Sequence, residues 1–465
     1  MTLGVLRRPG SVAILVALGL ILAGAGLGWL YPQVAYRFGP GLLPSVLALG
    51  GLLVLTLQRP VWGIVVALLL LPLGNLGFAL GPPWLLGTAW SVLLALMALL
   101  SGPATTGEAQ ARYRALPLTW AFLSLVLVTI LGWIVAGEAE TAVPVTRALL
   151  TGGCLFWAML VFVRRTEDVR LILVGFAGGA LLVGGYAVIQ YLGEEVSSGF
   201  FTSGGALVSR VSAGFGQPNQ LGGFLVLVLP FVLAGALASG RRLPWLAVLA
   251  IATFAVYASF SRGALIALVL VPLVFVGGRR IFLAAPLLVL LVAFATPDLV
   301  RERFATVTES GSEVATRADF YETALEIWLR SPFLGVGPGG FPAAYAEARV
   351  PGKGFVPATL FQPPPHAHNL ALQLLSEQGL LGLLAFTAVV VLAARAALLL
   401  RKSQERMLSL AGTAVLGTLV AVLVHNLVDV TLLETTAVYF WAVLGVAAAA
   451  TGILVRSSAD AERDG

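Results

Sequence analysis

The sequence predicts an all-α polytopic membrane protein, and three observations carry that prediction. Hydrophobic residues make up 59% of the 465 residues and charged residues only 11%, whereas a soluble domain carries about 25% charged residues. The mean hydropathy is +0.97. Apolar runs recur from residue 11 to residue 455, each close to the ~20 residues that cross a bilayer core as a helix. We do not find the ~10-residue alternating segments of a membrane β-barrel, so we expect a helical bundle.

Fourteen apolar runs are candidate spanning helices, and their number predicts about 12–14 transmembrane helices. The runs lie near 11–31, 41–57, 61–80, 84–100, 116–136, 143–163, 171–192, 219–239, 244–260, 264–276, 281–296, 369–397, 407–428 and 434–455. Those at 264–276 and 281–296 are short. The first run follows Arg7 and Arg8 and also resembles a signal peptide, but the orientation derived below is consistent if that segment stays.

The basic residues predict the orientation of the bundle. Connections rich in Lys and Arg stay on the cytoplasmic side, and here most basic residues fall in alternate connections. They are Arg7, Arg8, Arg59, Arg112, Arg114, Arg164, Arg165, Arg170, Arg241, Arg242, Arg279, Arg280, Arg401, Lys402, Arg406 and Arg456. We therefore expect both termini in the cytoplasm. This placement also accounts for the net charge of +6 without a nucleic-acid partner.

This orientation divides the chain into four parts. Residues 1–296 hold about eleven transmembrane helices and a smaller outer loop at 193–218. Residues 297–368 form a large outer loop. Residues 369–455 hold the C-terminal transmembrane helices, and residues 456–465 form a cytoplasmic tail.

The large outer loop is expected to contain two helices. Apolar residues at helical spacing predict an amphipathic helix over 310–330 and a second, shorter helix over 341–349. Pro and Gly residues after position 330 end the first helix. Residues 351–365 are rich in Pro and Gly and are expected to be extended.

Five arginines lie in outer connections, where the orientation rule does not favour them: Arg37, Arg210, Arg262, Arg317 and Arg330. Arg262 is the clearest case, because it lies in a tight turn between two apolar runs. A charge at membrane depth costs roughly 2.5–3.5 kcal/mol, so Arg262 either faces a polar cavity or a partner, or reaches the outer headgroups. Arg37, Arg210 and Arg330 are equally consistent with surface residues. Several guanidinium groups that converge outside would form a diphosphate clamp.

His366 and His368 are the second candidate feature. They follow three prolines at 363–365, whose stiff chain presents them at a fixed place, and they precede a helix that Asn369 is suited to cap. The positive end of that helix disfavours imidazolium, so a neutral ring there can accept a proton. One alternative is a polar anchor at the membrane surface. Another is a two-histidine metal site, but the sequence places no carboxylate at ligand spacing beside the pair.

Other residues have weaker signals or exclude classes of function. His425 is either part of an accessory polar cluster or a histidine whose hydrogen bonds are satisfied within the bundle. Glu377, roughly 13 Å below His368 along the helix, is expected to be paired or to line a cavity.

The single cysteine, Cys154, allows no intrachain disulfide and no cysteine metal cluster. The chain has no P-loop, so it is not itself an ATP-driven pump. It also has no Asp-x-Asp and no acid at 31–38, where a metal-dependent transferase needs carboxylates. We therefore expect no metal and no other cofactor.

Several of these segments together resemble the O-antigen ligase and polymerase superfamily of bacterial inner-membrane enzymes. The resemblance rests on Arg317 to Trp328, Ser331 to Gly339 and His366 to Asn369. The ligase pattern of His, then Asn, Ser or Gln, nine residues, Gly, two residues and Gly is met by His368, Asn369, Gly379 and Gly382. Arg262 and Arg317 resemble the family's two loop arginines, and the Pro-Asn pair ending at Asn219 resembles a family segment that opens a helix. The clear resemblance covers about 205–430.

The resemblance implies a GT-C-like fold with a large periplasmic loop and a metal-independent, inverting glycosyl transfer from an undecaprenyl pyrophosphate-linked glycan. It implies His368 as the general base, with Arg262 and Arg317 on the pyrophosphate. Arg210, Asn219, His366, Asn369 and Arg330 are the candidate substrate-binding residues. The expected acceptor is lipid A-core, in a step of lipopolysaccharide biosynthesis.

Three alternatives remain open at the level of sequence. A polymerase would join two lipid-linked repeat units, and a protein O-oligosaccharyltransferase would glycosylate side chains. A flippase of the same lipid-linked glycan would explain the outer arginines but not a histidine pair in a loop, because transporter sites usually lie at the bilayer midplane.

Overall fold

The computed structural model describes residues 42–76, 85–101, 117–137, 139–194, 198–201, 207–276, 313–348 and 366–464. Its helices are α3 (Leu42–Gln58), α4 (Pro60–Asn75), α5 (Leu85–Leu100), α7 (Pro117–Ala136), α8 (Ala139–Phe162), α9 (Thr166–Leu192), α10 (Pro218–Ala238), α11 (Leu243–Ala258), α12 (Arg262–Val276), α15 (Glu313–Arg330), α16 (Phe341–Ala348), α17 (Leu370–Arg401), α18 (Arg406–His425) and α19 (Glu434–Asp464). Strands β1 (Ser198–Phe201) and β2 (Leu207–Arg210) form an antiparallel pair in which Ser198 lies opposite Arg210.

The all-α polytopic fold class is confirmed. Twelve apolar helices coincide with the twelve predicted runs that fall within the described residues. By length and composition, seven of them are able to cross a membrane, and the other five are shorter. The runs near 11–31 and 281–296, Arg37, and the prolines at 363–365 lie outside the described residues. The predicted tail at 456–465 continues α19 as helix to Asp464.

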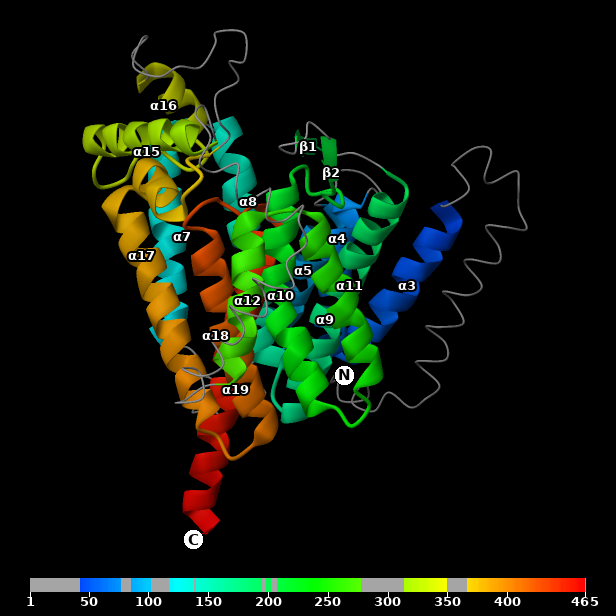
Figure 1. The fold of residues 1–465 in the computed structure, drawn as a ribbon. Helices are drawn as coiled ribbons and strands as arrows, with labels where there is room; N and C mark the ends of the chain where they lie inside the picture. The colour runs from blue at the N-terminus through cyan, green and yellow to red at the C-terminus, as the bar shows by residue number, and fades with distance from the viewer. Residues whose placement is uncertain are drawn as a thin grey trace.

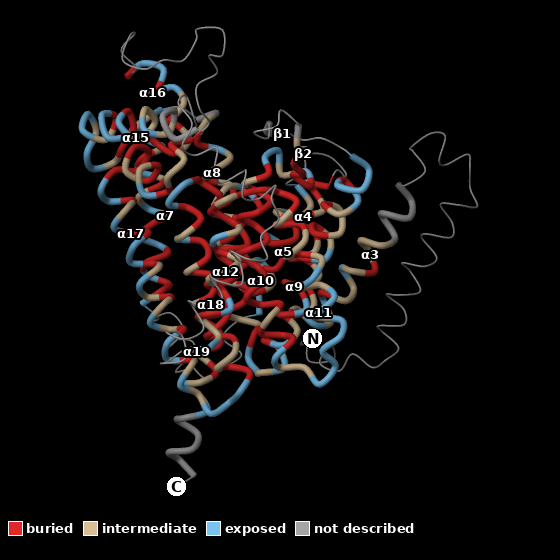
Figure 2. Tube along the Cα trace, in the orientation of Figure 1, coloured by how far each residue is buried: buried red, intermediate tan, exposed pale blue. Residues whose placement is uncertain are grey.

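The core of the bundle surrounds α10, which contacts α9, α11, α12 and α18. Helix α19 packs on α8, and α17 packs on α7 and α18 (Figure 1). Tyr439 of α19 meets Phe176 and Phe224 edge-on, with ring centroids 5.7 and 4.8 Å apart. Figure 2 shows that the buried residues are concentrated where these helices meet. This packing fixes the ends of α10, α17 and α18 relative to one another.

The two ends of the bundle differ in what they carry. The β1–β2 hairpin, α15 and α16 lie at one end, which we call the loop end, and α19 ends at the opposite one (Figure 1). At that opposite end, the Arg456 side chain donates to the carbonyl of Arg164 at 3.1 Å. Arg406 donates to the carbonyl of Leu237 at 2.7 Å. The connections that contain these arginines were predicted to be on the same, cytoplasmic side. In the structure they lie together at the end of the bundle opposite the large loop.

Helix α17 is broken at Gly379, which the sequence alone did not indicate. Gly379 has φ 64° and ψ −164°, and the segment 331–340 docks into the break. The amides of Val336 and Gly337 each donate at 2.9 Å to carbonyls of α17, and the carbonyl of Pro332 accepts from Leu380 at 2.8 Å. The break therefore leaves few backbone groups unpaired. It anchors the large loop to a spanning helix.

Replacing Gly379 by Ala is expected to destabilise the protein. This combination of φ and ψ is adopted almost only by glycine and costs a residue with a Cβ about 1–3 kcal/mol, and this Cβ would lie 2.2 Å from the carbonyl carbon of Phe333. Thermal unfolding in detergent measures the effect. The matched control is Gly185→Ala in α9, where a Cβ meets nothing within 4 Å and alanine favours the helix by about 1 kcal/mol. Equal melting temperatures for the two variants would contradict the docking of the loop at Gly379.

Candidate active site

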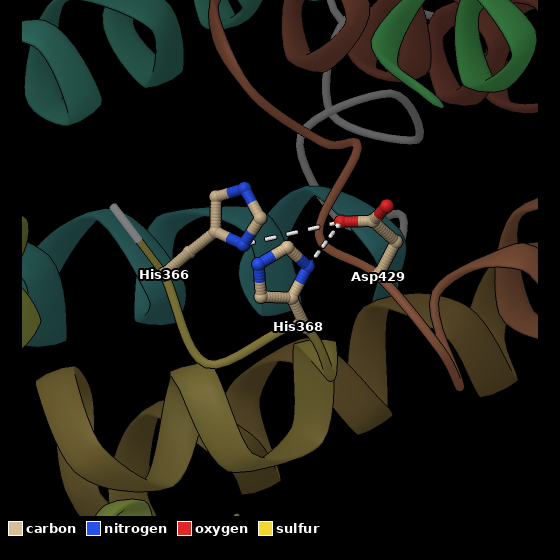
Figure 3. A group of neighbouring side chains, drawn as sticks. All are labelled: His366, His368 and Asp429. Carbon is tan, nitrogen blue, oxygen red and sulfur yellow. Dashed lines mark hydrogen bonds and ion pairs between the residues drawn. The ribbon is translucent and has the colours of Figure 1, made fainter. Parts of the chain in front are cut away.

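The site is organised around Asp429, which lies between α18 and α19 and is only 1% exposed. Its Oδ1 lies 3.1 Å from Nδ1 of His368 and 3.9 Å from Nδ1 of His366 (Figure 3). The amide of Val430 donates to Oδ1 at 2.8 Å, and the side-chain amide of Asn219 donates to Oδ2. A buried unpaired carboxylate would cost several kcal/mol, so these partners make the position tolerable.

Backbone contacts hold the start of α17 against the connection that carries Asp429. The amide of Leu370 donates to the carbonyl of Asn426 at 2.9 Å. The side chain of Asn369 donates to the carbonyl of Leu427 at 3.0 Å and accepts from the amide of Leu372 at 3.1 Å. The predicted capping of α17 by Asn369 is therefore confirmed, and both ends of its amide have structural partners.

His368 is held from the other side by α15. Its backbone lies in the left-handed region at φ 51°, which is uncommon for a residue with a Cβ, and the Tyr321 hydroxyl donates to its carbonyl at 3.2 Å. The ring of Phe320 stacks on the imidazole with centroids 5.5 Å apart and planes at 17°. The His368 side chain remains 18% exposed. The ring is thus fixed in orientation, and the side chain as a whole remains partly exposed.

The charges in the cluster are set by burial and by mutual contact. Burial alone would raise the pKa of Asp429, but the hydrogen bond from His368 and the three nearby histidines outweigh it and lower that pKa below its usual range. The pKa of His366 is lowered to about 4, mainly by burial; His368 and Arg317 also lower it, and Asp429 opposes the shift. Because ionised Asp429 accepts the proton on Nδ1 of His368, the Nε2 atom of a neutral ring is left as a proton acceptor.

Two of the predicted arginines line a cleft that Asp429 also lines. Arg262, the first residue of α12, and Arg317 of α15 line one narrow cleft together with Asn219, His425 and Asp429. The space within the cleft is about 20 Å³, which is room for roughly one water molecule. The cleft combines two guanidinium groups with a single ionised carboxylate.

The remaining candidate arginines have different positions. Arg210 is buried and donates from Nε to the carbonyl of Ser259 and from Nη2 to Asn219, both at 2.9 Å. It therefore supports Asn219 from behind. Arg330 is exposed at the C-terminal end of α15, about 20 Å from Arg317 along the helix at ~1.5 Å per residue. The structure does not bring Arg330 to the cleft.

The turn before α12 is shaped to receive His425. Ser261 Oγ lies 3.2 Å from Nε2 of His425, which is 1% exposed. A Cβ on Gly263 would lie 2.4 Å from Cδ2 of the same ring. The position after Arg262 therefore requires glycine, and His425 belongs to the wall of the cleft.

A second hydrogen-bonded chain links the large loop to the histidines. Gln373 accepts from the amide of Ala367, between the two histidines, at 2.7 Å. Glu377 is hydrogen-bonded to Gln373 and accepts from the amide of Phe341, the first residue of α16, at 3.1 Å. The expectation that Glu377 is paired within the bundle is confirmed, and its partners connect α16 to the backbone of the histidine pair.

The sequence did not indicate Asp429 as the partner of the histidines. The expectation that no carboxylate lies at ligand spacing beside His366 and His368 is wrong, because Asp429 lies within that spacing in the structure. The one feature of the sequence that could have indicated Asp429 is that an acidic residue lies in a predicted outer connection. No spacing rule relates position 429 to position 368, because the contact joins two helix ends.

Comparison with known proteins adds one match. A protein family model described as O-antigen ligase matches residues 245–387. The matched region holds Arg262, Arg317, His366 and His368, whereas Asp429 lies beyond it. No curated protein matches the chain.

Replacing Gly263 by Ala is expected to destabilise the protein because the new methyl group forces the His425 ring to move. Overpacking of this kind costs about 1–3 kcal/mol. The same change in a His425→Ala background should cost less, since the methyl group then has space. Chemical denaturation of the four proteins gives the coupling free energy. Purely additive effects would rule out the contact.

Proposed function

We propose that this chain, which belongs to the O-antigen ligase superfamily, is a metal-independent inverting glycosyltransferase. It moves a glycan from undecaprenyl pyrophosphate onto an acceptor sugar hydroxyl. The reaction takes place on the periplasmic side of the bacterial inner membrane, and both termini are cytoplasmic. The observation that carries the proposal is the meeting of a His368–Asp429 pair with Arg262 and Arg317 at the loop end of a membrane bundle.

In the transfer step, Nε2 of His368 takes the proton from the acceptor hydroxyl. The acceptor oxygen attacks the anomeric carbon from the face opposite the pyrophosphate, the bond from that carbon to the phosphate oxygen breaks, and its electron pair leaves with the pyrophosphate. The configuration at the anomeric carbon is therefore inverted. Asp429, 3.1 Å from Nδ1, stabilises the imidazolium that forms. General-base catalysis of this kind contributes about 10²–10⁴-fold in rate.

Arg262 and Arg317 supply the positive charge that the leaving pyrophosphate requires. A guanidinium group donates parallel hydrogen bonds to phosphate oxygens and keeps its charge at all physiological pH values. Charge stabilisation at the leaving group then needs no divalent metal. The cleft is too narrow for a pyrophosphate as it stands, so donor binding requires it to widen. Asn219 and Arg210 form its supporting side, and Asn369 and His366 flank His368.

A larger apolar groove next to the site suits the lipid tail of the donor. It has a volume of about 420 Å³ and lies between α7, α8, α17 and α19. Leu125, Leu149, Phe386 and Trp441 are among its lining residues, and Leu370 brings it to the first turn after His368. An isoprenoid chain can gain stabilisation there from the burial of apolar surface.

Ligases, polymerases and protein glycosyltransferases of this kind differ in the molecule that accepts the glycan. We propose lipid A-core as the acceptor, and a second lipid-linked repeat, as in a polymerase, is the main alternative. A protein side chain is a further alternative. Incubation of the purified protein with a defined lipid-linked glycan, with and without lipid A-core, followed by mass analysis of the products, separates them. Glycan on the core supports the ligase. Longer lipid-linked chains indicate a polymerase, and lipid flipping in proteoliposomes without a covalent product would refute the transferase.

His368→Ala is expected to lower the transfer rate by about 10²-fold or more, because the proton acceptor is lost. Asp429→Asn keeps the shape of the side chain but removes the charge that stabilises the imidazolium, so it should also lower the rate strongly. The control is Glu322→Gln, at an exposed position on α15. Rates are measured as product formed from the lipid-linked donor. Full activity of His368→Ala would remove its assignment as the base.

Transfer is also expected to persist in the presence of a divalent-metal chelator, since the two arginines neutralise the pyrophosphate. The measurement is the transfer rate of the purified protein before and after chelation. Loss of activity that is restored by adding a metal ion would show that the metal-free mechanism is wrong.

A further inference from the structure

His366 is a buried residue for which the transfer step has no use. Its side chain is buried and its Nδ1 has no hydrogen-bond partner within the described part of the chain. A buried polar atom without a hydrogen bond costs about 1–3 kcal/mol. The ring lies beside that of His368, with centroids 4.3 Å apart, and its Nδ1 points toward Asp429 (Figure 3). A ligand that bonds to this nitrogen would account for its position.

The three nearest ligand atoms have the spacing of a metal site. One ring nitrogen of His366, one ring nitrogen of His368 and an oxygen of Asp429 all lie within 4.8 Å of one another. The Nδ1 atoms of His366 and His368 lie 3.9 and 3.1 Å from Oδ1 of Asp429. An ion bonded at ~2.1 Å to each of three ligands in tetrahedral geometry holds those atoms about 3.4 Å apart. The observed nitrogen–oxygen distances of 3.9 and 3.1 Å differ from that spacing by only about 0.5 and 0.3 Å.

We propose that His366, His368 and Asp429 bind a divalent transition-metal ion of the zinc class, and that the bound ion inhibits glycosyl transfer. Two imidazoles and one carboxylate are ligands that Zn²⁺ and Co²⁺ accept, with a fourth position open to water or an anion. Mg²⁺ and Ca²⁺ prefer sets of oxygen ligands and are not expected to bind. The binding half of the proposal stands on the geometry, whereas the inhibition half rests on the proposed function.

Inhibition follows from the tautomer of His368. In the transfer step its Nδ1–H donates to Asp429 and Nε2 accepts the proton of the acceptor. A metal ion on Nδ1 requires that nitrogen without its hydrogen, so the proton moves to Nε2 and the ring keeps one proton in total. Nε2 then becomes a donor, and the ring no longer serves as a base.

The surrounding charges limit the affinity of the site. Arg262 and Arg317 line the adjoining cleft and repel a dication, while Asp429 is the one carboxylate among the described residues that line it. Oδ2 of Asp429 keeps its contact with Asn219 when Oδ1 binds the ion. Because the two arginines weaken the binding of any dication, we expect the ion to be removed by a chelator. Selectivity for zinc-class ions follows from the two imidazole ligands.

The composition of the chain makes binding simple to assign. It has three histidines and one cysteine, so the purified full-length protein without a histidine tag has few competing ligands. Titration with Co²⁺ should give visible absorption bands of a nitrogen- and oxygen-ligated ion at one ion per chain. Zn²⁺, but not Mg²⁺, should raise the melting temperature of the unaltered protein, because the ion binds the folded state. Absence of both effects would overturn the proposal without recourse to any variant.

Matched variants locate the ion. His366→Ala and His368→Ala should each lose the Co²⁺ bands, whereas His425→Gln should keep them, since His425 lies outside the three-ligand group. Bands that persist in His366→Ala, or disappear only in His425→Gln, would refute the assignment.

The inhibition half is tested in the unaltered enzyme. Zn²⁺ at concentrations that saturate the site should lower transfer at least tenfold, and chelation should restore it. Binding of the ion with undiminished transfer would overturn the inhibition half and with it the use of Nε2 as the base. A protein that binds the ion but transfers no glycan under any condition would refute the proposed function and leave the metal site intact.

Discussion

The buried carboxylate of Asp429 is the constraint on which the loop end of this protein depends. An ionised group with so little exposure must be compensated by its neighbours, and here the neighbours come from three separate parts of the chain. Asn219 opens α10, His368 precedes α17, and Val430 leads into α19. Satisfying one charge therefore fixes the ends of three helices in a single arrangement. The same arrangement brings the His368 ring to Asp429, and Asp429 lines the cleft that also holds Arg262 and Arg317.

The loop end also depends on a second feature, which is the close approach of the segment 331–340 to the backbone of α17 at Gly379. At Gly379 the helix opens and the segment 331–340 hydrogen-bonds into the gap, which sets the position of α15. Because α15 carries Phe320, Tyr321 and Arg317, the same docking orients the His368 ring and brings the second guanidinium to the cleft. Gly379 lies away from the candidate site, but it affects the position of His368 and Arg317 through the packing of α15.

The proposed proton transfer, which uses Nε2 of His368, and the proposed metal binding, which uses Nδ1, both depend on whether Nδ1 carries a hydrogen. With a hydrogen on Nδ1, the pair with Asp429 makes Nε2 basic; with an ion on Nδ1, the ring is locked in the opposite tautomer. His366 has no place in the first state but supplies a ligand in the second. The same buried cluster therefore supports both the proposed transfer and its proposed inhibition, and the tautomer of one ring separates the two.

By itself, the sequence determined the features that depend on neighbouring residues. Hydropathy and helix length located the twelve described apolar helices, and helical periodicity together with Pro and Gly signals located α15 and α16. The predicted position of Arg262 in an outer connection, where an arginine is not favoured, and the histidine pair at a helix start identified two parts of the candidate site. Only the tertiary structure decided that Asp429 meets His368, that Arg210 supports Asn219 and that Arg330 lies away from the cleft. Those outcomes depend on how helix ends distant in sequence pack against one another, and periodicity within a helix contains no information about that packing.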